Sequence, residues 1–166
     1  MKKILMAMVA GILSACMVTG CSTVDTKGWE TYNIGDKVHF QLDPSWDIDE
    51  DKENNWIDCY IETTNNFGQL SIFLKEKLEW ESVGGTIQLS LQSFQDSDGE
   101  YKKGWPVEIG GKTAFHIETT EYDCHRYTIA LDDQFWVDVI TMTEEGTGQE
   151  EVKEIIDQVL DSIRFS

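Results

Sequence analysis

The alternation of apolar and polar residues along the chain predicts a domain built mostly from β-strands. In residues 38–42, apolar Val38, Phe40 and Leu42 alternate with polar His39 and Gln41, the period of a strand with one buried face. Further runs with strand character lie at residues 56–64, 69–75, 112–120, 124–131 and 134–142. Several of these strands are apolar on both faces and therefore need cover on both sides. The pattern predicts an α+β fold, an antiparallel sheet of about six strands covered by helices on both faces.

The turns between these runs set the registers that we expect. A four-residue hairpin loop at 65–68 would put Cys59, Ile61, Ile72 and Leu74 on one face of the sheet. A tight turn at Asp132-Asp133 would bring Ile129 against Trp136 on one face, with Phe135, Val137 and Val139 on the other.

A hairpin centred near Tyr122 would join the runs 112–120 and 124–131. In that register Glu118 lies opposite Arg126, as a cross-strand ion pair worth a few tenths of a kcal/mol. His116 and His125 would then not be neighbours, and we expect no metal site between them.

One helix is predicted at the C-terminal end and a second in the middle of the chain. The first has an apolar stripe at spacings of three and four, made of Val152, Ile155, Ile156, Val159, Leu160 and Ile163. Thr147 and Glu150 stand at capping-box spacing before it. The second is predicted over 86–95, although Ile87, Leu89 and Leu91 also alternate like a strand and Gly84-Gly85 disfavours helix at its start.

The N-terminal segment has the layout of a secretory signal peptide. Lys2 and Lys3 precede an apolar run over 4–13. The run to Gly20 falls short of the roughly 20 apolar residues of a membrane span, and it contains polar residues and glycines. No other segment approaches spanning length.

The residues before Cys21 resemble the lipobox of bacterial lipoproteins, namely Val18-Thr-Gly-Cys21. Leu13-Ser-Ala-Cys16 fits the same pattern, but cleavage there would leave a very short signal. We therefore expect a lipoprotein signal peptide at 1–20 and lipidation of Cys21 by fatty (palmitate-type) chains. The alternatives are lipidation of Cys16, or an ordinary secreted or uncleaved segment. The expected location is the extracytoplasmic face of the cell membrane.

The remaining chain divides into a short polar tether at 21–30 and one domain at 31–166. Without its first 20 residues the chain has 11 basic and 31 acidic residues, a formal charge of −20. Such a charge argues against nucleic acid as a partner and against electrostatic adhesion to anionic lipid. The covalent lipid must then hold the protein at the membrane.

Two cysteines, Cys59 and Cys124, remain in the domain. A disulfide between them would persist outside the cytoplasm. Cys59 shares a strand face with Ile57 and Ile61, as a small buried apolar residue would, so two free thiols have more support than the bridge, and a catalytic thiol has the least.

The acidic stretch 47–58 carries oxygen-bearing side chains at positions 1, 3, 5, 7, 9 and 12, as in a calcium loop. Lys52 stands where such a loop has glycine, and strand character begins at Trp56. The stretch is read either as a calcium site or, with more support, as a solvated acidic loop.

Other candidate chemistry is sparse. No Gly-x-Ser-x-Gly elbow occurs. Trp46, Trp56 and Trp136 fit sheet packing, whereas Trp29, Trp80 and Trp105 lie at or near loops. An exposed patch with Trp80 and Trp105 would indicate a binding site, and the alternative is that these rings cover core edges.

Three stretches carry a resemblance to the PsbP-like superfamily of α/β/α sandwiches. They are Phe40-Gln-Leu-Asp-Pro-Ser-Trp46, Ile109-Gly-Gly-Lys-Thr-Ala114, and the ending Ile156 to Phe165, which closes in Ser162-Ile-Arg-Phe165. Ser45 departs from the glycine that is frequent at its position. The superfamily includes an extrinsic subunit of photosystem II, a nuclear-transport factor that binds the Ran GTPase, and many bacterial lipoproteins. The resemblance implies a module for binding or assembly and supplies no catalytic residues.

We therefore expect a membrane-anchored lipoprotein acting as a non-catalytic binding or assembly module for a protein or envelope partner, without cofactor. A receptor domain for a small ligand, a glycan or calcium is the alternative.

Overall fold

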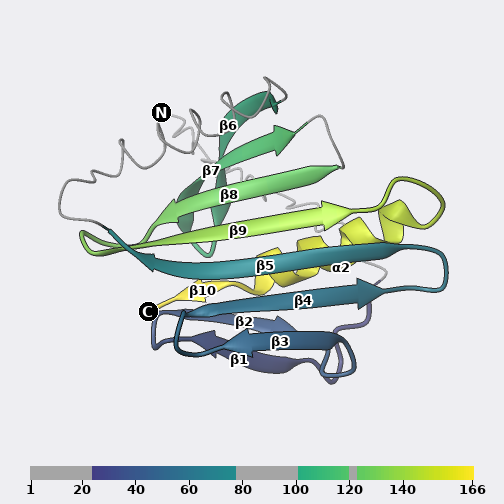
Figure 1. Cartoon of the computed structure of the whole chain (residues 1–166), viewed down its shortest axis with the longest axis horizontal. Helices are drawn as coiled ribbons and strands as arrows, with labels where there is room; N and C mark the ends of the chain where they lie inside the picture. Colours follow the sequence, from purple (N-terminus) through teal and green to yellow (C-terminus); the bar gives the residue numbers. More distant parts are fainter. Residues whose placement is uncertain (1–23, 78–100, 120–122) are drawn as a thin grey trace, which may run out of the picture.

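Two antiparallel sheets and one helix make up the described part of the chain (Figure 1). The computed structural model describes residues 24–77, 101–119 and 123–166, with only the backbone at 101–103. The strands are β1 (Glu30–Ile34), β2 (Val38–Leu42), β3 (Asp47–Asp51), β4 (Trp56–Glu62), β5 (Phe67–Glu76), β6 (Tyr101–Ile109), β7 (Lys112–Thr119), β8 (Cys124–Ala130), β9 (Phe135–Thr143) and β10 (Arg164–Phe165). The helix is α2 (Gln149–Ser162).

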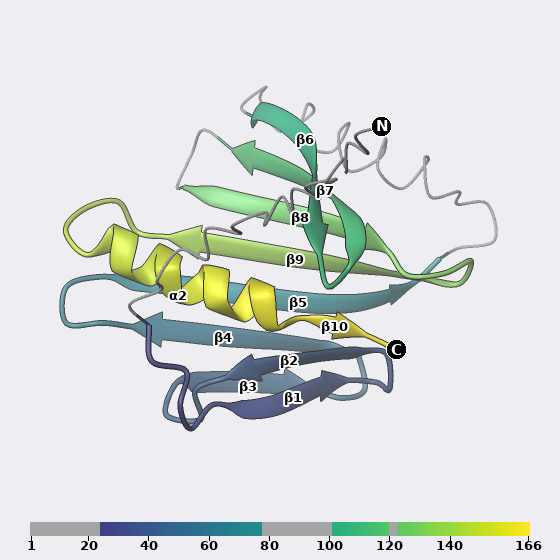
Figure 2. The same ribbon diagram turned by 180° about the vertical axis from the view of Figure 1, so that it is seen from behind.

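The larger sheet has seven strands in the order β3-β4-β5-β9-β8-β7-β6, and the smaller has three in the order β1-β2-β10. Helix α2 and the small sheet lie side by side on the same face of the large sheet, as the view from behind shows (Figure 2). We call this the helix face of the large sheet, and the other the opposite face.

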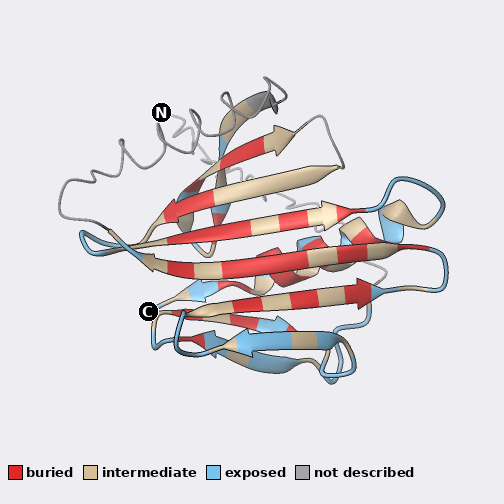
Figure 3. Ribbon diagram, in the orientation of Figure 1, coloured by how far each residue is buried: buried red, intermediate tan, exposed pale blue. Residues whose placement is uncertain are grey.

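The core fills the space between the helix face and the layer that covers it. Buried residues concentrate in the central strands β4, β5 and β9 (Figure 3). The helix face contributes Ile57, Cys59, Ile61, Leu70, Ile72, Val137 and Val139, all fully buried. Val38, Phe40 and Leu42 of β2 meet them from the small sheet. Because apolar and polar residues alternate in β2, one whole face of this strand lies in the core, as predicted.

Helix α2 confirms the predicted stripe. Val152, Ile156, Val159 and Leu160 are buried. The capping box was wrong, because the N-cap is Gly148 in a left-handed conformation (φ 89°) with no side-chain cap. The helix ends where Ile163 becomes extended, which lets β10 pair with β2.

The predicted antiparallel sheet is confirmed, and its composition differs from the prediction. The run 38–42 belongs to the separate small sheet, and β1, β3, β6 and β10 were not predicted. In the described ranges α2 is the sole helix and covers one face, so helices on both faces find no support there. The predicted helix 86–95 lies outside these ranges. No helix in them is long and apolar enough to cross a membrane.

The predicted registers differ from the structure in all three hairpins, but the predicted faces are right in one of them. Cys59 pairs with Leu70 and Ile61 with Gly68, so the predicted face is confirmed, although the strands are displaced by an even number of residues. Ile129 pairs with Val137 instead of Trp136. Glu118 pairs with His125 instead of Arg126. These two errors are slips of one residue, which exchange the faces of one strand relative to its neighbour.

Candidate functional site

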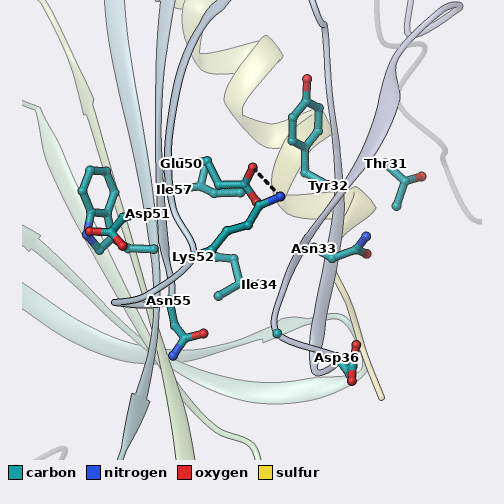
Figure 4. Close-up of a pocket in the computed structure, with 12 residues that line it drawn as sticks. Thr31, Tyr32, Asn33, Ile34, Asp36, Glu50, Asp51, Lys52, Asn55 and Ile57 are labelled. Atoms are coloured by element: carbon teal, nitrogen blue, oxygen red, sulfur yellow. Dashed lines mark ion pairs between the residues drawn. The ribbon is translucent and has the colours of Figure 1, made fainter.

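A polar cleft of about 420 Å³ lies where β1 and the turn after it approach the hairpin of β3 and β4 (Figure 4). Its polar side chains come from both sheets: Thr31, Asn33, Asp36, Glu50, Asp51 and Lys52. Buried Ile34 and Ile57 also line it. We call this the inter-sheet cleft. Its volume is in the range of small-molecule sites.

The electrostatics of the inter-sheet cleft are dominated by carboxylates. The Lys52 ammonium pairs with Glu50 at 3.4 Å, and its side chain is 80% exposed. Burial raises the pKa of the Tyr32 phenol, and the negative charges of Glu30 and Glu50 add to the rise. The cleft therefore disfavours additional negative charge and favours a cationic or hydrogen-bonding group.

Asp51 has a structural role at the rim of this cleft. Its carboxylate accepts hydrogen bonds from the Asn54 side chain (2.7 Å) and from the amides of Asn54 (2.9 Å) and Glu53 (3.0 Å). The bonds from Asn54 lower the pKa of Asp51 below its usual range. Asp51 thus closes the turn in which Asn55 adopts a left-handed conformation (φ 56°).

The acidic stretch 47–58 is a β-hairpin and does not form the calcium loop. Strand alternation puts Asp47, Asp49 and Asp51 on the opposite face and Ile48 and Glu50 on the helix face. In the described residues no three His, Cys, Asp or Glu side chains are arranged to hold a metal ion. The reading as a solvated loop is also wrong, since β3 is an edge strand, where carboxylates discourage pairing with other chains.

A second polar cluster lies on the helix face of β7 and β8. His116 Nε2 and His125 Nδ1 are 2.9 Å apart, and His125 Nε2 is 3.2 Å from an Asp123 carboxylate oxygen. The Trp105 ring meets His116 edge-on at 4.4 Å, and the Tyr127 ring stacks on it at 4.4 Å. We call this the histidine cluster. The register error hid it, because it requires Glu118 to face His125.

Asp123 anchors this cluster to helix α2. Its carboxylate accepts hydrogen bonds from Thr143 Oγ1 (2.7 Å) and Gln149 Nε2 (2.8 Å) and pairs with Lys153 Nζ (2.9 Å). Burial raises the pKa of Asp123, but the bonds from Lys153 and Thr143 and the nearby charges outweigh it and lower the pKa to about 2. The carboxylate is therefore ionised and fixed beside His125.

Burial shifts the pKa values of the two stacked rings, His116 and Tyr127, in opposite directions. Desolvation, with a smaller repulsion from His125, lowers the pKa of His116 to about 4. Desolvation also raises the pKa of Tyr127, with a contribution from Asp157. Both rings are thus neutral near pH 7.

The predicted lipidation residue Cys21, its alternative Cys16 and the residue Trp80 lie outside the described residues. Trp29 and Trp46 contact each other edge-on at 5.1 Å and pack against the core, which fits the reading that they cover its edge. Trp105 belongs to the histidine cluster.

The disulfide is not formed, because Cys59 and Cys124 are both free thiols. Cys59 is on the helix face of β4, and Cys124, opposite Met142, is on the other face of β8. Three strand spacings of about 4.8 Å separate β4 from β8, beyond the reach of a bridge. Burial raises the pKa of Cys59 to about 12, so its thiol is protonated and unreactive.

We expect alkylation of the native protein without reductant to modify Cys124 well before Cys59. Cys59 is fully buried, whereas Cys124 is only partly buried. Mass spectrometry of the peptides after timed exposure to iodoacetamide measures this order. A Cys124→Ser variant should gain label at Cys59 only after denaturant is added. Resistance of both thiols until a reductant is added would contradict two free cysteines.

Comparisons with known proteins identify the fold and nothing more. No family model and no curated protein matches the chain. Among solved structures it is similar to the solution structure of cyanobacterial PsbP (CyanoP) from Synechocystis sp. PCC 6803, with a TM-score of 0.58 and 13% identity. The match covers 94% of this chain and 100% of that one. The fold is therefore PsbP-like.

Proposed function

We propose that this chain is a membrane-anchored, extracytoplasmic lipoprotein whose PsbP-like domain is a non-catalytic binding or assembly module for a protein or envelope partner. In this proposal residues 1–20 are the signal peptide, Cys21 carries the lipid and residues 21–30 tether the domain 31–166. The observation that carries the binding role is the inter-sheet cleft, which is polar, acidic and open to solvent.

Two properties of the cleft suit a protein partner. Its walls belong to different sheets, β1 on one side and the β3–β4 hairpin on the other, so a bound segment would contact both. Asp36 and Glu50 are exposed, and Lys52 is the cation that pairs with Glu50 there. Basic or amide groups of a partner could replace that weak surface pair at little cost, because exposed pairs contribute only about 0–1 kcal/mol.

The alternative is a receptor for a small ligand or glycan in the same cleft. Its volume of about 420 Å³ would accommodate such a molecule. Calcium has less support, since β3 is extended and Glu50 lies on the helix face, away from the three aspartates on the opposite face.

Capture from detergent-solubilised membranes with the full-length chain tests the binding role. We expect a reproducible partner with the wild type, its loss with Glu50→Arg in the cleft, and its retention with Glu62→Arg. Glu62 is a matched control, since it is an exposed carboxylate at the far end of β4. Equal capture by both variants would place the interaction elsewhere, and no partner with any chain would contradict an assembly role.

The anchor is tested separately by mass spectrometry of the mature N-terminus. We expect a diacylglyceryl thioether on Cys21, and release of the protein from the membrane in a Cys21→Ala variant. Acyl chains on Cys16, or a bare thiol at Cys21, would contradict this assignment.

A further inference from the structure

Among the described strands, four form the edges of the two sheets: β3 and β6 in the large sheet, β1 and β10 in the small one. Edge strands are commonly protected from further pairing by charges, proline, bulges or shortness. β3 carries four acidic residues, β6 contains Pro106 and a register shift between Tyr101 and Lys103, and β10 has two residues. β1 lacks these protections apart from one charge, at Glu30. It pairs with β2 in unbroken register over five residues and contains no proline.

The outer edge of β1 borders the inter-sheet cleft. In both views of the fold, β1 and β3 lie along the same side of the molecule (Figure 1, Figure 2). Residues 31–34 of β1 line the cleft, and Glu50 and Lys52 of the β3–β4 hairpin line it from the other side (Figure 4). In an edge strand, the N–H and C=O groups of alternate residues point away from the neighbouring strand. In the described ranges no strand pairs with these groups of β1, so they are available at the cleft.

We infer that the inter-sheet cleft binds an extended segment of a protein partner, which adds to the outer edge of β1 as a further strand and directs a lysine or arginine side chain toward Glu50. The inference rests on the proposed binding role and specifies the chemistry of the partner. In strand addition, main-chain hydrogen bonds provide affinity, and the surroundings of alternate side chains provide specificity.

The charges of the cleft determine which side chain the partner presents. Of the described residues that line the cleft, Asp36, Glu50 and Asp51 are acidic and Lys52 is basic. Asp51 is held by its turn, whereas Glu50 is exposed and pairs with a lysine whose side chain is 80% exposed. An incoming cation therefore replaces Lys52 beside Glu50 at little cost, because Lys52 turns to solvent. The partly buried Tyr32 ring offers an apolar surface for the methylene stem of that side chain.

Binding of a strand-forming peptide to the purified full-length protein tests the inference. The peptide is an acetylated, amidated and fluorescently labelled heptapeptide of alternating threonine and lysine, and its affinity is measured by anisotropy. We expect it to bind, and we expect the same peptide with glutamate in place of lysine not to bind. Glu50→Arg should weaken the lysine peptide by about 5–30-fold, the equivalent of one or two kcal/mol. Glu62→Arg is the matched control and should leave the affinity unchanged, since Glu62 lies at the far end of β4.

Two N-methylated isomers of the lysine peptide separate strand addition from simple attraction between charges. Backbone groups of alternate residues point to the same edge of a strand, so methylation of the lysine amides or of the threonine amides blocks one edge only. We expect one isomer to lose at least about tenfold in affinity and the other to retain it, because one edge faces β1. Residue-resolved hydrogen exchange should also show new protection at alternate amides of β1. Both measurements use the wild-type protein and do not depend on the folding of a variant.

Three results would overturn the inference. They are equal affinities of the two N-methylated isomers, unchanged binding of the lysine peptide to Glu50→Arg, and no binding of the lysine peptide to the wild type. None of them contradicts the proposed binding role, which is decided by the capture of a partner from membranes.

Discussion

Replacement of Asp138 by alanine is expected to destabilise the domain by about 3–5 kcal/mol, the usual cost of breaking a buried ion pair. Asp138 is fully buried in the middle of β9, on the opposite face of the large sheet. Its carboxylate accepts hydrogen bonds from Arg126 Nε (2.9 Å) and Thr128 Oγ1 (2.9 Å) on β8. Lys75 Nζ on β5 lies 3.3 Å from it, so three strands converge on one charge.

The cost is high because the carboxylate is fully buried and its guanidinium partner is largely shielded from water. The Arg126 side chain is 15% exposed, and its guanidinium also contacts Asp138 through Nη2. Lys75 lies over the rings of Phe73 and Trp136, which orients its ammonium toward the carboxylate. Without Asp138 the Arg126 guanidinium loses a negative partner that water cannot fully replace at that depth, whereas the more exposed Lys75 can turn to solvent.

Urea unfolding monitored by circular dichroism measures the effect. Asp138→Asn keeps the size and some hydrogen bonds of the side chain, so it should destabilise less than alanine. Asp49→Ala removes an exposed carboxylate from the same face, on edge strand β3, and should change the stability by less than about 0.5 kcal/mol. Equal stabilities for Asp138→Ala and Asp49→Ala would show that the buried network contributes nothing.

The same network shows why sequence reasoning found the strands but not their pairing. Alternation identified β2 and most of β4, β5, β7, β8 and β9, because one face of each is apolar over several residues. The register between β7 and β8 was misjudged by one residue, because a hairpin centred near Tyr122 pairs Glu118 with Arg126. The structure pairs Ala114 with Ile129, both fully buried, and Arg126 finds Asp138 on β9 instead. Burial of apolar residues outweighs a surface ion pair.

The strands that were missed have little sequence signal of their own. Four of the five residues of β3 are acidic, and it is held by its pairing with β4. β10 has two residues and exists because α2 delivers Arg164 and Phe165 to the edge of β2. Such elements depend on tertiary neighbours, which local propensity does not report.

The candidate sites could not be predicted from the sequence, because they too depend on which segments become neighbours in the fold. The inter-sheet cleft joins residues 31–36 to 50–57 across two sheets, and nothing in either segment indicates that they face each other. The histidine cluster could have been found from the correct register alone. Aligning the apolar residues Ala114 and Ile129 as partners puts His116 opposite Tyr127 and Glu118 opposite His125. Both histidines then lie on the same face of two adjacent strands.

Replacement of Gly68 by alanine is the second change from which we expect a large loss of stability, about 1–3 kcal/mol from overpacking. Gly68 lies on the helix face of β5, directly under α2. A Cβ atom there would come 2.4 Å from Val152 Cγ1 and 3.3 Å from the carbonyl oxygen of Met142. The clash with Val152 requires the first turn of the helix to move away from the sheet, and the backbone oxygen limits any compensating shift of β5.

The position also explains why a glycine interrupts an otherwise apolar strand. Leu70 and Ile72 follow it on the same face and are fully buried, so a larger residue would fit the pattern of the strand but not the space under α2. Helix α2 can then approach β5 closely enough for Val152 and Ile156 to reach the core.

A double-mutant cycle with Val152→Ala measures this contact. Val152→Ala alone should destabilise the domain by removing buried methyl groups, whereas added to Gly68→Ala it should cost less, because it relieves the clash. The two changes are therefore expected to be non-additive by at least about 0.5 kcal/mol. Strict additivity of the two changes in urea unfolding would mean that Val152 does not pack on Gly68. It would then contradict the close packing of α2 on β5.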